Sequence, residues 1–185
     1  MACNITSGRN EECLNNTGGI RNIYFVNFGD LGGVTYGVDD EITDFGATVS
    51  INAYKYELNA TSNNLTQTIN ASRDNGTVFY DQILSVTLKK MSKEMNREIK
   101  LLSAGRPYIF VEDNNGNSYA VGITNGVSAN GGSIVTGGAL GDLNGYTLTL
   151  QGQEPSPASF MSGGIVDNPF DGLSTATVTI VEGTN

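Results

Sequence analysis

The sequence predicts a mainly β protein, a sandwich or barrel with one flanking α-helix, in a single domain spanning residues 1–185. Apolar residues alternate with polar ones in many short runs, which is the spacing of half-buried strands. Turn-forming Gly and Asn separate these runs, and 24 Gly stand against only 4 Pro. One segment has apolar side chains at helical spacing. A chain of this length buries about 70% of its unfolded surface, so it needs no disulfide to fold.

The chain is predicted to begin with a polar N-terminal arm, followed by short strands. The arm spans residues 1–17 and precedes Gly18-Gly19. An acidic turn is expected at Asp39-Asp40-Glu41. Alternation bounded by glycines and acidic residues predicts strands on both sides of that turn, at residues 20–28, 34–38, 47–51 and 54–58.

The polar segment at residues 59–76 is predicted to be the tip of a long hairpin. It contains strand-forming Leu65 and Ile69 among polar neighbours. The residues on its two sides, 54–58 and 78–80, have matched β character, so we expect them to pair as the two stems. Such an arm gains backbone hydrogen bonds when the sheet edge of a neighbouring chain receives it.

The clearest strand is residues 78–88. One face of it is apolar and is interrupted only by Gln82. The helix follows at residues 91–104 and is stopped by Gly105 and Pro107. Its apolar stripe is expected to pack on the subunit's own sheet and consists of Met91, Met95, Ile99 and Leu102.

A tight hairpin and two further strands are predicted after the helix. Two apolar runs, residues 108–111 and 119–123, are joined by Asp113-Asn114-Asn115-Gly116-Asn117, a typical hairpin turn composition. A Gly-rich stretch at 125–141 comes next and is too apolar at Ile134-Val135 to be a pure linker. The remaining elements are a strand at 145–152, a long C-terminal loop at 154–173 and a last strand at 175–181.

The composition argues against an enzyme. The chain has no His, the commonest general base and a frequent zinc ligand. Its paired carboxylates all fall in a predicted turn or arm and are interpreted as solvated charges: Glu11-Glu12, Asp39-Asp40-Glu41 and Glu112-Asp113. Asp113 to Gly116 lacks the spacing of a calcium loop, and Gly137 to Gly141 lacks the lysine and helix of a phosphate loop. No catalytic, cofactor or metal site is therefore predicted.

Charge and hydropathy limit the partners. The net charge of −9 argues against tight binding of nucleic acid, which needs clustered cations. No run approaches the roughly 18 apolar residues of a membrane span, and the N-terminus lacks the pattern of a signal peptide. Cys3 and Cys13 leave three possibilities open: reduced thiols, a local disulfide, or a metal shared between subunits.

The order of strand, helix, hairpin, Gly-rich segment and strand resembles the tail tube proteins of tailed bacteriophages. Three stretches carry the resemblance and cover over a third of the chain: residues 1–25, 88–122 and 141–154. The first resembles the start of small structural proteins of phages that infect Bacteroidetes-like hosts. The third contains Gly-Tyr-Thr-Leu-Thr-Leu-Gln-Gly at 145–152. These motifs consist of packing and turn residues rather than a reactive site.

The resemblance implies a structural virion protein. Six subunits would form a ring around a channel, and rings would stack into the tail tube, a conduit for genome delivery. The partners would be other copies of the chain and other tail or neck proteins, in a virion assembled in the host cytoplasm. The expected inter-ring arms are residues 1–17, 59–76 and 154–173. Six copies at −9 carry −54 charges per ring, and an acidic wall would let DNA pass without tight binding.

Three alternatives stay open. A neck or head-to-tail ring of a short-tailed phage would share the same fold, and fold analogy does not separate it from a tube. A secreted adhesin or carbohydrate-binding module would also be rich in Gly, Asn and Thr. That class usually presents Trp to sugar rings, and this chain has none. A small hydrolase is disfavoured by the missing His.

Overall fold

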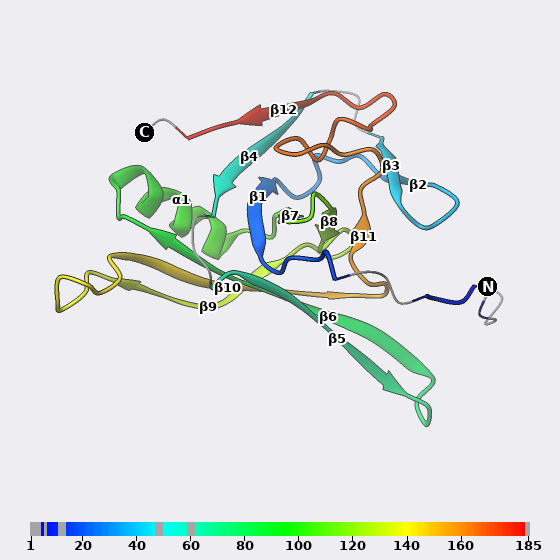
Figure 1. Cartoon of the computed structure of the whole chain (residues 1–185), viewed down its shortest axis with the longest axis horizontal. Coiled ribbons are helices and arrows are strands. Elements are labelled where there is room, and N and C mark those ends of the chain that lie inside the picture. Colours follow the sequence, from blue (N-terminus) through cyan, green and yellow to red (C-terminus); the bar gives the residue numbers. More distant parts are fainter. Residues whose placement is uncertain (1–4, 6, 11–13, 47–49, 59–61, 184–185) are drawn as a thin grey trace.

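The computed structural model describes residues 5, 7–10, 14–46, 50–58 and 62–183. Within these residues the protein is mainly β and has a single helix, as the sequence predicts. Two sheets pack face to face, the helix lies at one end between them, and a smaller hairpin with the C-terminal loop covers the far side of the larger sheet (Figure 1).

The larger sheet, sheet I, has the strand order β11-β8-β7-β1-β4-β12. Its neighbours are antiparallel except for β12, which runs parallel to β4. The strands are β1 (Ile20–Val26), β4 (Ile51–Glu57), β7 (Tyr108–Asp113), β8 (Ser118–Val121), β11 (Ser159–Phe160) and β12 (Val178–Val181). β1 and β7 are buried on both faces, which explains why their sequences are almost continuously apolar.

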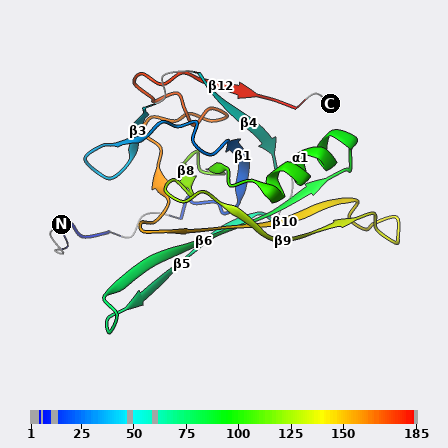
Figure 2. The same cartoon turned by 180° about the vertical axis from the view of Figure 1, so that it is seen from behind.

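The second sheet, sheet II, has the order β5-β6-β10-β9, and each neighbouring pair is antiparallel. Its strands are β5 (Asn64–Ser72), β6 (Thr77–Lys89), β9 (Ser128–Val135) and β10 (Gly145–Glu154). Residues alternate between buried and half-exposed along β6 and β10, because one face meets sheet I and the other lies outside. Sheet II forms one long side of the molecule in both views (Figure 2).

Two hydrophobic clusters lie on opposite faces of sheet I. Ile23 and Ile109 of sheet I meet Leu84 and Leu150 of sheet II in the first. In the second, Tyr24 and its neighbours are covered by the hairpin of β2 (Val34–Tyr36) and β3 (Ile42–Phe45) and by the C-terminal loop. Phe170 of that loop makes edge-to-face contacts with Tyr24 and Phe110, at centroid distances of 5.7 and 4.9 Å.

The helix α1 (Lys93–Ala104) begins at Ser92, whose hydroxyl accepts the N–H of Met95 at 3.0 Å. Ile99 is buried in the first cluster, and Met91, Met95 and Leu102 pack around it. The predicted stripe therefore packs on the subunit's own core, and each large side chain contributes up to about 1.5–3 kcal/mol.

The predicted pairing of residues 54–58 with 78–80 is wrong. Strand β4 pairs with β1 and β12 in sheet I, whereas β6 pairs with β5. Residues 64–72, assigned to the hairpin tip, are strand β5 itself, and the turn is confined to residues 73–76. Residues 54–57 thus form one strand with residues 51–53, and the predicted strand at 47–51 lies partly outside the described residues.

Three other differences separate the structure from the sequence predictions. The Gly-rich stretch contains β9, and the acidic turn is followed by β3; neither strand was predicted. The C-terminal loop was expected to be an arm, but Ala158, Met161 and Phe170 in it are buried in the subunit. Cys3 and Cys13 lie outside the described residues.

Candidate assembly surface

The outer face of sheet II is a broad polar surface made largely of hydroxyl and amide side chains. Residues of one parity point outward on each strand, and Thr147 of β10 lies opposite Thr87 of β6 and Ser133 of β9. The hydroxyls of Ser133 and Thr147 are 2.7 Å apart and hydrogen-bonded. The charged residues on this parity of the described strands are Asp81 and Lys89, and Asp81 accepts a 2.6 Å hydrogen bond from Gln151. The face is therefore polar but nearly uncharged.

Both edges of sheet II are open among the described residues. β5 is hydrogen-bonded only to β6, and β9 only to β10, along strands of 9 and 8 residues. Unpaired edges of this length are templates for pairing with another chain. The two edge strands run in opposite directions, because three antiparallel pairings separate them. An edge β5 set beside the β9 of an identical, rotated copy is therefore antiparallel to it.

The outer part of the β5–β6 hairpin extends past the core. Gln67 anchors β5 to the loop after β10, because its Oε1 accepts the N–H of Ala158 at 2.7 Å, and β6 stays paired with β10 as far as Tyr80. Beyond Gln67, Ile69 and Val78 point to the core side of the hairpin but are 65% and 54% exposed. This part forms the thin projection in Figure 1. It presents apolar side chains that the described residues cover only in part.

At the opposite end of sheet II, the loop between β9 and β10 is held in one conformation. Asp142 Oδ2 accepts the N–H groups of Gly138 and Ala139 at 2.9 and 2.7 Å, and these bonds lower the pKa of Asp142. Gly137 has a φ of 75°, where an added Cβ would lie 2.9 Å from that of Asp142. Leu140 stands fully exposed at the tip. This loop contains the Gly137 to Gly141 segment, which lacks the sequence pattern of a phosphate loop. The neighbouring Asp142 carboxylate accepts the backbone N–H groups that a bound anion would need.

Glu112 corrects the prediction that the paired carboxylates are all solvated. Its side chain is fully buried at the end of β7. One oxygen accepts from Asn22 and from the Tyr24 hydroxyl at 2.9 and 3.2 Å, and the other accepts the N–H of Asp167 at 3.1 Å. Burial and the Glu112 carboxylate raise the pKa of Tyr24. Glu112 therefore ties the C-terminal loop to sheet I, and Asp167 is also paired with Lys55 at 3.4 Å.

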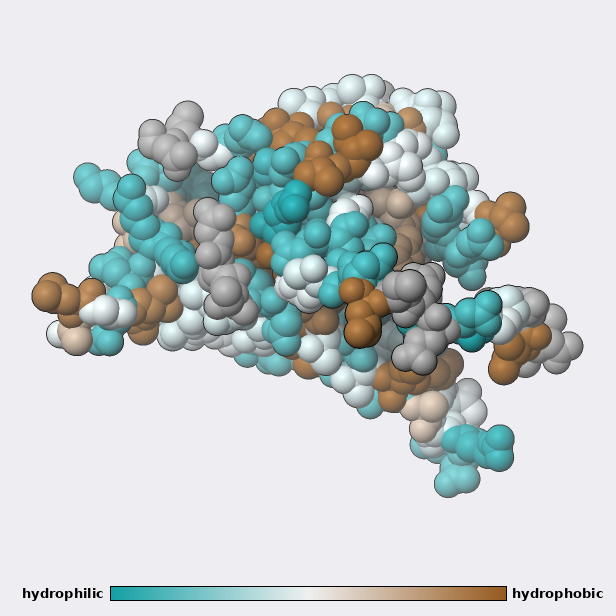
Figure 3. Space-filling view, viewed as in Figure 1, coloured by the Kyte–Doolittle hydropathy of each residue, from teal (hydrophilic) through white to brown (hydrophobic). Residues whose placement is uncertain are grey.

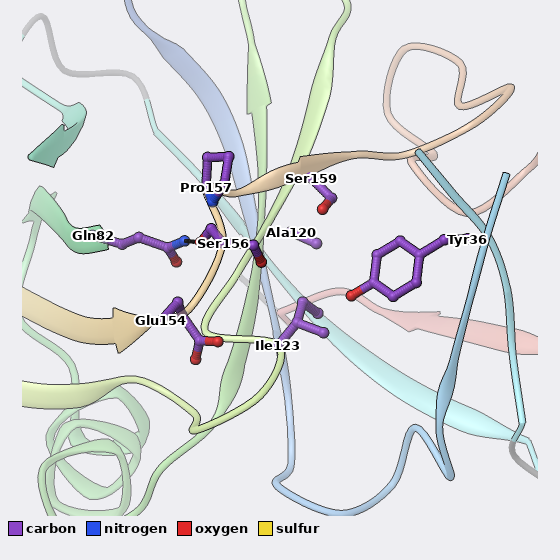
Figure 4. Close-up of a pocket in the computed structure, with 8 residues that line it drawn as sticks. All are labelled: Tyr36, Gln82, Ala120, Ile123, Glu154, Ser156, Pro157 and Ser159. Atoms are coloured by element: carbon purple, nitrogen blue, oxygen red, sulfur yellow. Dashed lines mark hydrogen bonds between the residues drawn. The ribbon is translucent and has the colours of Figure 1, made fainter. Parts of the chain in front are cut away.

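Gln82 and Glu154 join sheet II to the loops around it (Figure 4). Gln82, the polar residue on the apolar face of β6, accepts the N–H of Gly122 at 3.0 Å and donates to the carbonyl of Ser156 at 3.2 Å. Glu154 accepts the N–H groups of Thr124 and Asn125. The cavity between them has a volume of about 10 Å³, so it has room for about one water molecule and none for a substrate.

A second, open groove of about 390 Å³ lies beside the β9 edge. Its lining is polar and comes mainly from Arg106, Asn125, Asn130, Gln151 and Gln153. The lining has neither a carboxylate pair nor an aromatic platform. Among the described residues no group of three acidic or cysteine side chains is placed to hold a metal ion. In the same part of the chain, no helix is long and apolar enough to cross a membrane.

Comparison of this chain with protein-family models, with curated proteins and with solved structures finds no match.

Proposed function

We propose that this protein is a structural subunit that assembles through the edges of sheet II into rings, and that stacked rings form a tube of the bacteriophage tail type. The observation that carries the proposal is the open sheet II, with unpaired edges of opposite direction and one uncovered polar face. An identical copy related by rotation supplies the partner strand that each edge lacks. The resulting wall is a continuous antiparallel β-barrel with sheet I and α1 on its outside.

The dimensions favour a channel that admits duplex DNA. Six copies with β5, β6, β10 and β9 each would give 24 strands. At about 4.8 Å per strand the wall measures about 115 Å around and about 37 Å across between backbones, and strand tilt widens it further. The protein would then be located in the virion, where neck or other tail proteins cap the tube.

The chemistry of the outer face also favours passage of DNA without tight binding. Phosphate contacts require clustered Lys and Arg, and of the described sheet II residues on this face only Lys89 carries a positive charge. The chain's net charge of −9 lies mostly elsewhere, so the wall is neutral rather than acidic as the composition suggested. Hydroxyl and amide groups hydrate the channel without holding the backbone of the DNA.

Cysteine cross-linking with electron microscopy tests the proposal. In a Cys3→Ser/Cys13→Ser background, Thr66→Cys or Thr68→Cys on β5 is combined with Gly131→Cys or Ser133→Cys on β9. One of these cysteine pairs should give a ladder of disulfide-linked multimers that ends at the number of subunits in the ring. Each variant with a single cysteine should give no product larger than a dimer. Negative-stain images should show rings and tubes. Single rings that never stack would indicate a neck protein, and a monomer at high concentration would refute the proposal.

A further inference from the structure

The two ends of sheet II differ in charge. Residues 89–100, at the end of β6 and along α1, contain five of the ten cations and two of the nineteen carboxylates of the chain, a net charge of +3. The remaining residues have five cations and seventeen carboxylates, a net charge of −12. We call the part made by Lys89, Lys90, Lys93 and the loop at residues 136–144 that carries Leu140 the basic end. Glu94 and Asp142 also lie there, so its net charge is +1. Lys90 N–H donates to the carbonyl of Asn144, which places the lysines beside the loop.

The opposite end carries acidic groups, of which Asp39 and Asp40 are exposed and Glu41 is half-exposed. The turn between β2 and β3 holds Asp39, Asp40 and Glu41, and the sequence has no Lys or Arg from Asn22 to Tyr54. Figures 1 and 2 place this turn and the β5–β6 hairpin at one end of the long axis, and the β9–β10 loop at the other. In the hairpin turn Arg73 and Asp74 offset each other. We call this part the acidic end.

Charges at the two ends do not compensate each other within one subunit. The 13 residues of β6 span about 43 Å at 3.3 Å per residue. Exposed charges are screened beyond about 8 Å at physiological ionic strength. The two ends are therefore too far apart to offset each other within one subunit, and they complement each other in sign.

Both ends also expose large apolar side chains. Leu140 is fully exposed on its pinned loop, and the acidic end exposes Val38 at 102% together with Ile69 and Val78. Hydrophobic atoms stand out at both extremities of the molecule in Figure 3. A rigid loop that presents an apolar tip loses little conformational entropy on docking, which is the usual property of an interface anchor.

We infer that the basic end of one copy docks on the acidic end of a second copy, with Leu140 as the apolar anchor inside a ring of opposite charges. The inference rests on the proposed function and names the surfaces that meet when one ring stacks on the next. A head-to-tail contact of this kind is open-ended, so it produces a filament of rings rather than a closed pair.

Charge reversal tests whether opposite charges hold the basic end of one copy against the acidic end of the next. Lys90→Glu/Lys93→Glu should leave ring formation intact and reduce mean tube length at least tenfold. Arg97→Glu/Lys100→Glu is the matched control, since it changes the charge equally further along α1 and should leave tube length unchanged. Adding Asp39→Lys/Glu41→Lys to the first variant exchanges the signs of both ends and should restore tubes. Wild-type tubes should shorten as salt rises from 50 to 500 mM.

Leu140→Asp tests whether Leu140 is the apolar anchor. Leu101→Asp, which changes an exposed leucine on α1, is its control. The first should block stacking and the second should not. Normal tubes from Lys90→Glu/Lys93→Glu, loss of its rings, or failure of the fourfold variant to restore tubes would each overturn the inference. A wild-type chain that forms no rings would instead refute the ring proposal itself, so the two failures are distinguishable.

Discussion

The carboxylate of Asp44 accepts a 2.6 Å hydrogen bond from the hydroxyl of Thr175, 131 residues later in the chain. The same side chain accepts the N–H groups of Thr175 and Ala176 at 3.1 and 3.0 Å. Asp44 lies in β3, and Thr175 precedes β12, so this contact fixes the entry of the last strand into sheet I. These hydrogen bonds lower the pKa of Asp44 from 3.8 to about 2.

The lowered pKa of Asp44 predicts acid sensitivity. The carboxylate form is favoured in the folded state, so its contribution to stability is complete above about pH 4 and is lost as the pH falls toward 2. Asp44→Asn should lower the melting temperature at pH 6, and the difference from wild type should vanish near pH 2. Asp74→Asn, in the exposed β5–β6 turn, controls for the change in net charge. A difference that persists unchanged at pH 2 would contradict the assignment.

Ile99 is predicted to be the main anchor of α1. It is 7% exposed, whereas Leu101 on the same helix is 56% exposed and Leu102 is only partly buried. Ile99→Ala should cost about 2–5 kcal/mol in the free energy of unfolding, because it leaves a cavity in the core. Leu102→Ala should cost less, and Leu101→Ala should stay within about 0.5 kcal/mol of wild type. Urea unfolding measures all three, and equal losses at Leu101 and Ile99 would show that the helix packs on a different face.

Glu112→Gln tests the buried carboxylate. An amide has one acceptor oxygen, so the substituted side chain turns an NH₂ group toward donors from Asn22 and Tyr24 or toward the N–H of Asp167. The free energy of unfolding should fall by about 1–3 kcal/mol. Glu57→Gln, an exposed carboxylate next to Lys55, is the control and should have little effect. No loss at Glu112 would mean that the C-terminal loop is held by its apolar contacts alone.

Local sequence predicts the strands that have a periodic apolar face, and it does not show what covers them. The long β6 strand, α1 and the β7–β8 hairpin are confirmed close to their predicted bounds. β9 is hidden by its glycines, although β10 passes so close that a Cβ on Gly132 would lie 2.4 Å from the carbonyl oxygen of Thr147. A strand selected for close backbone approach has little of the side-chain pattern that identifies strands.

The hydrogen bonds around Glu112 could not be predicted either, because the residues that make them are far apart in the chain. Glu112 is followed by Asp113 and a turn sequence, so its neighbours in the chain indicate solvent. Its hydrogen-bond partners Asn22 and Asp167 lie 90 and 55 residues away. Gln82 is different, because an isolated amide on an otherwise apolar strand face is a sequence signal of a buried hydrogen-bonding residue. The candidate assembly surface follows from the sheet order, and no local sequence pattern specifies which strands lie at the edges.

The outer part of the β5–β6 hairpin is predicted to act between rings rather than within the subunit. Replacing residues 69–80 by Asn-Gly joins Thr68 to Asp81, which are paired opposite each other, and keeps the Gln67 contact to Ala158. This removes Ile69 and Val78, which are more than half exposed, and Tyr80, which pairs with Glu154 at the end of β10. The shortened protein should keep its melting temperature within a few degrees, form rings, and lose stacking in negative-stain images.

A longer deletion provides the contrast. Replacing residues 60–75 removes β5 and with it Asn63, which is buried and accepts the N–H of Thr87 at 2.8 Å. Sheet II then loses one edge, so rings should fail as well as tubes, and the subunit should be destabilised. Because β5 pairs with β6 along its whole length, the two deletions separate an edge strand from an arm. Normal tubes from the shorter deletion would refute the role of the hairpin tip, and intact rings from the longer one would refute β5 as the ring edge.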